Sequence, residues 1–145
     1  MKYIINPFIS VGNLKFGTDR QSVNGYLNTK FKSVFEQTTD GVNIVNDHYD
    51  SEGLILGYFD KIFKLRYIIL TDPCEVFFEN KDLLEMNYRE CLNFMKKYDK
   101  NVEEEEYVGF TSYKYGISIY AEDAAENPDC CIEAVTIGER GYFEK

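Results

Sequence analysis

Hydrophobic and polar residues alternate along several short runs of the chain, which is the pattern of strands with one buried face. The clearest alternation lies within Ile62–Leu70, directly after another β-rich run at Leu54–Phe59. The two runs are joined at Asp60-Lys61 and predict a hairpin. Turn-forming residues separate the other β-rich runs. These further strands are predicted to begin at Val76 and to span Gly116–Tyr120 and Cys131–Ile137.

Two segments have helical spacing instead. Thr18 and Gln21 fit a capping box, in which a hydroxyl and an amide satisfy free backbone donors, and they predict a helix that ends near Asn28. The second predicted helix has Asn87 as its N-cap and Glu90 three residues later. Its apolar stripe consists of Tyr88, Cys91, Leu92, Met95 and Tyr98.

Strands that follow one another through short connections favour antiparallel pairing, with helices covering the sheet. The predicted fold class is therefore α+β, with an antiparallel β-sheet of about five or six strands packed by two α-helices. A chain of 145 residues fits one domain and has no internal repeat or low-complexity linker. We expect residues 1–145 to form a single globular domain.

The charge of the chain is strongly uneven along its length. The 25 acidic and 16 basic residues give a net charge of −9, and residues 1–72 are neutral, so the excess lies in residues 73–145. Nucleic acids and anionic membranes bind through clusters of Lys and Arg, so both are unfavourable partners. The field of the second half would instead steer a basic protein partner toward it. The alternative is that the acidity serves only solubility.

Cofactors and membrane association are not indicated. The chain has four cysteines without a C-x-x-C pair, and only one histidine, so we expect no metal site and no cofactor. The apolar run after Met1 ends at Asn6-Pro7, too early for a signal peptide, and no run of 18 apolar residues exists. These features predict a cytoplasmic protein with buried, reduced thiols at Cys74, Cys91, Cys130 and Cys131.

No set of catalytic residues is visible in the sequence. His48 lies between acidic residues in Asn46–Asp50, which we interpret as a solvated loop. Asp47–Gly53 has the composition of a calcium loop, but Tyr49 occupies a position that needs an oxygen ligand. Nucleophile elbows, phosphate loops and dinucleotide fingerprints are absent. We therefore predict that the protein is not an enzyme, while carboxylate chemistry around Asp47, His48 and Asp50 stays an alternative.

Two acidic clusters near tyrosines are the candidate binding residues. Carboxylates offer charge-assisted bonds to Lys and Arg, and tyrosine gives a large contact area with few torsions to order. The alternative is that the glutamates form solvated loops and the tyrosines lie in the core. The predicted partner-binding residues are Glu103, Glu104, Glu105, Glu106, Tyr107, Tyr113, Tyr115, Glu122, Asp123, Glu126 and Asp129.

The order of these segments resembles that of small immunity proteins, which protect bacteria from their own polymorphic or contact-delivered toxins. The resemblance covers most of the chain and rests on spacing. It begins where the glycine-bounded run Val11–Gly17 leads into the capped helix. It continues through the Gly53–Leu70 hairpin, the Leu83–Tyr98 helix, Gly116–Tyr120 and the closing Gly141–Phe143.

This resemblance implies a role and no individual functional residue. The chain would be an antitoxin that binds and neutralises a cognate bacterial toxin domain of the ribonuclease or other nuclease class, by acidic surface complementarity. A general protein-interaction or adaptor module is the main alternative, and an unrecognised carboxylate-dependent enzyme is a third. Gene context separates the first two, because an antitoxin needs a toxin gene beside it.

Overall fold

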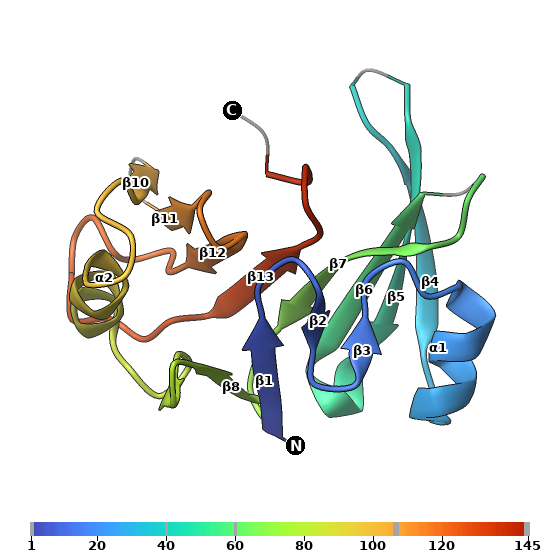
Figure 1. The fold of residues 1–145 in the computed structure, drawn as a ribbon, viewed down its shortest axis with the longest axis horizontal. Coiled ribbons are helices and arrows are strands. Elements are labelled where there is room, and N and C mark those ends of the chain that lie inside the picture. The colour runs from blue at the N-terminus through green and yellow to red at the C-terminus, as the bar shows by residue number, and fades with distance from the viewer. Residues whose placement is uncertain (1, 40, 60, 106–107, 144–145) are drawn as a thin grey trace.

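The computed structural model describes residues 2–39, 41–59, 61–105 and 108–143. Within these residues the chain forms thirteen strands and two α-helices, with a large sheet beside a smaller one (Figure 1). The α+β class and the mostly antiparallel pairing are confirmed. The predicted count of five or six strands is wrong. Several of the additional strands are only two or three residues long, too short for hydrophobic alternation to reveal them.

The larger sheet has eight strands, and each strand pairs antiparallel with its neighbours. Its order is β10-β11-β12-β13-β7-β6-β5-β4, so β10 and β4 are its two edges. Its strands are β4 (Lys32–Gln37), β5 (Asn43–Tyr49), β6 (Leu54–Phe59), β7 (Leu65–Leu70), β10 (Glu103–Glu105), β11 (Gly109–Ser112), β12 (Ile117–Tyr120) and β13 (Ala134–Gly138).

The smaller sheet has five strands in the order β3-β2-β1-β8-β9. Its central pair, β1 and β8, is parallel, with Tyr3 opposite Val76, which departs from the antiparallel prediction. Parallel neighbours need a long connection, and here the chain builds half of the larger sheet, β4 to β7, between them. The strands are β1 (Lys2–Asn6), β2 (Ser10–Val11), β3 (Leu14–Lys15), β8 (Glu75–Phe78) and β9 (Lys81–Asp82).

The two faces of the larger sheet have different roles. On one face, which we call the core face, Leu56, Ile68 and Ile137 are fully buried in one cluster with residues of the smaller sheet and both helices. The opposite face, here the open face, carries half-buried side chains on a continuous row of cross-strand neighbours. These are Ser118, Thr136, Ile69, Ile55 and His48. Successive side chains of each strand therefore point alternately to the core face and to the open face.

Helix α2 (Tyr88–Lys96) confirms the second predicted helix. Asn87 accepts the Glu90 backbone N–H at 2.9 Å, and Glu90 accepts the Asn87 N–H at 3.1 Å, which completes the capping box. Helix α1 (Arg20–Leu27) ends at Asn28 as predicted. Its N-cap is Asp19, and not the predicted Thr18, because the Asp19 carboxylate accepts both the backbone N–H and the hydroxyl of Ser22. Neither helix has the length and apolar character required to cross a bilayer, among the described residues.

The segment interpreted as a loop at Asn46–Asp50 belongs mainly to β5, and this prediction is wrong. A short 3-10 helix, Asp50–Glu52, follows the strand. The second arm of the predicted hairpin starts at Leu65 rather than Ile62, because the chain between β6 and β7 makes a turn with Phe63 at φ 52°. Strand β13 likewise begins at Ala134, three residues later than predicted.

Candidate functional site

Residues from both segments that carry the predicted acidic clusters line one pocket. The pocket has a volume of about 230 Å³, and both β10 and the turn that joins β12 to β13 line it. The Ala121 N–H donates to the Val108 carbonyl at 2.7 Å and fixes the turn beside β11. The lining residues are Tyr88, Glu104, Glu105, Val108, Gly109, Ala124 and Ala125. We use the name acidic rim for Glu104 and Glu105, which line the pocket, together with the exposed Glu122, Asp123 and Glu126 of the turn whose Ala124 and Ala125 line it.

The glutamate run does not form one continuous patch, because successive strand residues point to opposite faces. Glu104 lies opposite Phe110 of the core face and accepts the Tyr88 hydroxyl at 3.1 Å. Glu105 lies opposite Gly109 and accepts the Thr111 hydroxyl at 2.7 Å. Two rim carboxylates are therefore held in place by neutral donors. Burial, and then the nearby Glu104 carboxylate, raise the pKa of Tyr88, so its hydroxyl keeps its proton and donates.

The turn between β12 and β13 supplies three further carboxylates of the rim. Glu122, Asp123 and Glu126 are all exposed. The Glu122 backbone N–H donates to Glu133 at 2.6 Å, which brings a further carboxylate to the turn. Asp129, also exposed, pairs with Arg89 at 3.1 Å and so tethers the far end of the turn to α2.

Tyr120 reports the negative potential of this region. Its side chain is 43% exposed on the last residue of β12. Partial loss of hydration, and then the carboxylates of Glu122, Glu133 and Asp123, raise the pKa of Tyr120. These carboxylates repel a tyrosinate anion, so they would attract a cation placed at the same position. The turn is therefore suited to Lys or Arg side chains of a partner.

The predicted tyrosines are not gathered at the pocket. Tyr115 packs its ring 5.1 Å from that of Phe78, and its hydroxyl donates to the Tyr98 carbonyl at 3.3 Å, so it ties the β11–β12 turn to β8 and to the segment after α2. Tyr113 is half-buried on the same turn. Glu106 and Tyr107 lie outside the described residues, and Glu103 is half-buried at the start of β10.

Sequence reasoning missed the two tyrosines that do flank the rim. Tyr88 was assigned only to the apolar stripe of its helix, although its hydroxyl reaches Glu104. Tyr120 could have been found, because it alternates with Ile117 and Ile119 and must therefore point away from the core.

Gly109 is expected to be the residue most sensitive to enlargement at this site. Its φ is 152°, and an added Cβ would lie 1.8 Å from the Ile119 carbonyl oxygen, so alanine would push β11 away from β12. Gly109→Ala is expected to lower the free energy of unfolding by about 1–3 kcal/mol, measured by urea denaturation. Gly25→Ala is the matched control, since an added Cβ there meets open space on α1. It is expected to stabilise the protein by about 0.5–1 kcal/mol, and equal losses for both would contradict the role of Gly109.

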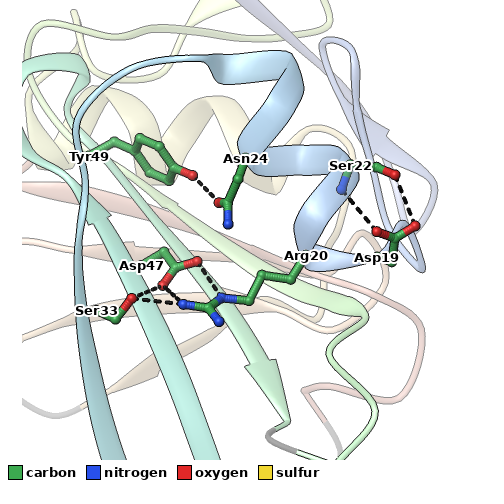
Figure 2. A network of polar contacts seen from close by, with 7 residues as sticks. All are labelled: Asp19, Arg20, Ser22, Asn24, Ser33, Asp47 and Tyr49. Carbon is green, nitrogen blue, oxygen red and sulfur yellow. Dashed lines mark hydrogen bonds and ion pairs between the residues drawn. The ribbon is translucent and has the colours of Figure 1, made fainter.

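A second polar cluster lies at the other end of the larger sheet (Figure 2). Asp47, fully buried on β5, accepts the Arg20 Nε at 2.8 Å, the Arg20 guanidinium again at 2.9 Å, and the Ser33 hydroxyl at 2.7 Å. These bonds raise the pKa of Arg20, with the Asp47 bond the largest cause. Tyr49 donates to Asn24 beside them. Every partner belongs to α1, β4 or β5, so the cluster joins the helix to the sheet.

This geometry separates the residues of the alternative carboxylate site. Asp47 points to the core face, whereas His48, the next residue on β5, points to the open face and lies beside Lys32 and Ile55. Asp47 therefore cannot orient the imidazole of His48. A shallow pocket of about 320 Å³ does adjoin His48, and Lys30, Phe31, Lys32, Asp50 and Ser51 complete its lining.

The exposure of the four thiols and the placement of the acidic side chains determine whether this protein can hold a metal ion. Cys74 and Cys91 are buried, as predicted, while Cys130 is half-buried and Cys131 is exposed; all four are free thiols. Burial raises the pKa of Cys91 to about 12, which disfavours the thiolate that a metal requires. Across the part of the chain that the structure describes, no three His, Cys, Asp or Glu side chains are placed to hold a metal ion.

Buried tyrosines predict sensitivity to alkaline pH. Burial, the largest cause for each, raises the pKa of Tyr3 and of Tyr49 to about 12, and it also raises the pKa of Tyr58 and Tyr67. The unfolded chain releases these protons near pH 10, so their contribution to stability is complete below pH 10 and falls as the pH rises toward 12. Tyrosinate absorbance and the loss of circular dichroism are expected to change together above pH 10. Full ionisation of the tyrosines in a folded protein would contradict this.

Comparison of the chain with protein-family models, with curated proteins and with solved structures finds no match to any of them.

Proposed function

We propose that this protein is a cytoplasmic immunity protein, which binds and neutralises a cognate bacterial toxin domain of the nuclease class through its acidic rim. The observation that carries the proposal is the meeting of two acidic segments at one pocket. Glu104 and Glu105 line the pocket beside Tyr88, and so do Ala124 and Ala125 of the Glu122–Glu126 turn, which is distant from them in sequence. Nucleases bind phosphates through Lys and Arg, and a surface of carboxylates can occupy such a cleft.

The internal hydrogen bonds of the rim support tight binding. Glu104 and Glu105 are already held by Tyr88 and Thr111, so a partner need not order these side chains. Interactions that are arranged before association cost less entropy when the complex forms. The exposed carboxylates of the turn would act earlier, by steering a basic partner toward the pocket. Together these features favour a fast association and a slow dissociation.

The product of the neighbouring gene tests the proposal. Expressed alone, that product is expected to arrest growth and to degrade nucleic acid, and co-expression with this protein is expected to restore growth. The two chains are expected to co-elute as a stable complex, and the purified complex is expected to have lost nuclease activity. A neighbour that is harmless alone, or that forms no complex, would contradict the proposal. A stable complex with a harmless neighbour would instead favour the adaptor function.

The carboxylate-enzyme alternative can be tested in the same cells. His48→Ala and Asp50→Ala are the informative variants, since Asp47 is committed to Arg20 and its replacement would disturb the fold. Under the immunity proposal both variants are expected to protect cells as well as the natural protein does. Loss of protection by a folded His48→Ala variant would favour chemistry at the open face.

A further inference from the structure

Strand β4 is the second edge of the larger sheet, at the end opposite the acidic rim. Figure 1 shows the β4–β5 hairpin projecting from the body of the molecule. Phe35, in the middle of β4, is 68% exposed, more than any other large hydrophobic side chain among the described residues. A long edge strand with an exposed aromatic residue is a template for pairing with a further strand.

The hairpin turn shows which backbone groups of β4 face outward. The Thr38 N–H donates to the Val42 carbonyl at 2.8 Å, and the Gly41 N–H donates to the Thr38 carbonyl at 3.0 Å. Thr38 and Val42 are thus a hydrogen-bonded pair, and such pairs alternate along an antiparallel ladder. Counting back, Glu36, Val34 and Lys32 bond to β5. The N–H and C=O groups of Ser33, Phe35 and Gln37 therefore point away from β5.

The side-chain pattern of this edge is complementary to itself. Lys32 and Glu36, both exposed, lie at equal distances from Val34 along β4. If a second β4 runs antiparallel with Val34 opposite Val34, Lys32 of each copy faces Glu36 of the other. Opposite charges directly across two strands stabilise the pair.

The same register also pairs the outward-facing backbone N–H and C=O groups of the two strands. With Val34 at the centre, Ser33 of each copy lies opposite Phe35 of the other, and these are the residues whose N–H and C=O groups point outward. The two Phe35 rings become diagonal neighbours, a separation that aromatic side chains can span. A register centred on Phe35 would also align outward groups, but it would place Glu36 opposite Val34 and Lys32 opposite Thr38. Of these two registers, the charges therefore favour the one centred on Val34.

We propose that two copies of this protein associate through β4, with Val34 at the two-fold axis, to join their eight-stranded sheets into one. The dimer leaves the acidic rim of each copy at its far end, so it does not depend on the function proposed above. It also covers Phe35, the most exposed aromatic side chain among the residues that the structure describes, and removes one open sheet edge from each copy.

Charge exchange across the interface tests the proposal by sedimentation velocity. The natural protein is expected to shift from monomer to dimer as its concentration rises toward roughly 1 mM. Lys32→Glu and Glu36→Lys each place like charges opposite one another twice, and each is expected to raise the dimer dissociation constant by about tenfold. The double variant Lys32→Glu/Glu36→Lys restores both pairs and is expected to dimerise like the natural protein. Lys15→Glu on β3 and Glu79→Lys on the turn between β8 and β9, both exposed and outside the proposed interface, are the controls and are expected to change nothing.

Amide hydrogen exchange gives a second readout of the register. Dimerisation is expected to slow exchange at Ser33 and Phe35, and to leave exchange at Val34 and Glu36 unchanged, since their amides already face β5. A protein that stays monomeric at all these concentrations overturns the proposal. A dimer that ignores both single charge reversals, or that protects the amides of Val34 or Glu36 in place of those of Ser33 and Phe35, overturns it equally.

Discussion

Replacing Arg20 with methionine is expected to lower the free energy of unfolding by about 3–5 kcal/mol. The change leaves the Asp47 carboxylate, which is fully buried, with the Ser33 hydroxyl as the hydrogen-bond donor that remains from the cluster. A buried charge without its counter-ion is among the most costly defects in a folded protein. The methionine keeps the apolar part of the contact with Phe63, over which the guanidinium now lies. Urea denaturation followed by circular dichroism measures the loss.

The partner substitution is expected to cost less. Asp47→Asn leaves the Arg20 side chain, which is 24% exposed and can turn toward water, so its expected loss is about 1–3 kcal/mol. Replacing both residues, in Arg20→Met/Asp47→Leu, removes both charges and is expected to recover most of the stability lost by Arg20→Met.

Arg89→Met is the control for these changes, because the Arg89–Asp129 pair is more than half exposed on both sides. Its expected cost is at most about 1 kcal/mol. Equal losses for Arg20→Met and Arg89→Met would show that the buried cluster does not hold α1 on the sheet.

Reversal of the exposed rim charges is expected to have the largest effect on function. The triple variant Glu122→Lys/Asp123→Lys/Glu126→Lys should slow association with the product of the neighbouring gene by about 10- to 10³-fold. These three side chains are exposed on the turn, so the fold should tolerate the change. Stopped-flow or surface-plasmon measurements give the rate, and circular dichroism confirms that the variant is folded.

A charge-matched control separates the rim from the net charge. Glu75→Lys/Glu79→Lys/Glu85→Lys changes the net charge by the same amount, and these exposed residues lie in the same half of the sequence but outside the rim. The control variant is expected to associate nearly as fast as the natural protein. If both triple variants slow association equally, the net charge and not the rim determines binding.

Elements with a local signature were predictable from the sequence. Helix α2 has a complete capping box and an apolar stripe within nine residues, and it forms where predicted. Strand β6 is a continuous β-rich run, and its predicted bounds, Leu54–Phe59, are those of the structure. In both elements the local preference and the tertiary environment agree.

Elements that depend on distant partners were not predictable. Strand β5 contains Asn46, Asp47 and His48, a sequence typical of a loop, and it becomes a strand because Arg20 neutralises the buried Asp47 from 27 residues away. Strand β10 consists of three glutamates with little intrinsic preference for a strand, and pairing with β11 determines its conformation. The hydrophobic and polar pattern of these short segments predicts neither the Arg20–Asp47 ion pair nor the pairing of β10 with β11.

The candidate site was also predictable only in the features that the local sequence determines. Charge along the chain identified both acidic clusters, and the structure brings Glu104–Glu105 and the Glu122–Glu126 turn to one pocket. Sequence could not show that Tyr115 is needed for packing against Phe78, or that Tyr88 reaches Glu104. The first contact depends on how the β11–β12 turn packs against β8, and the second on how α2 lies against β10. The local sequence pattern determines neither.

The ionic-strength dependence of association tests the central claim most directly. Electrostatic attraction between the rim and a basic toxin cleft is screened as the Debye length falls from about 10 Å at 0.1 M salt to about 3 Å at 1 M. The association rate of the natural protein with the neighbouring gene product is expected to fall steeply over this range. The rate of the Glu122→Lys/Asp123→Lys/Glu126→Lys variant is expected to be low and nearly constant. Identical salt dependence for the two proteins would contradict a function based on the acidic rim.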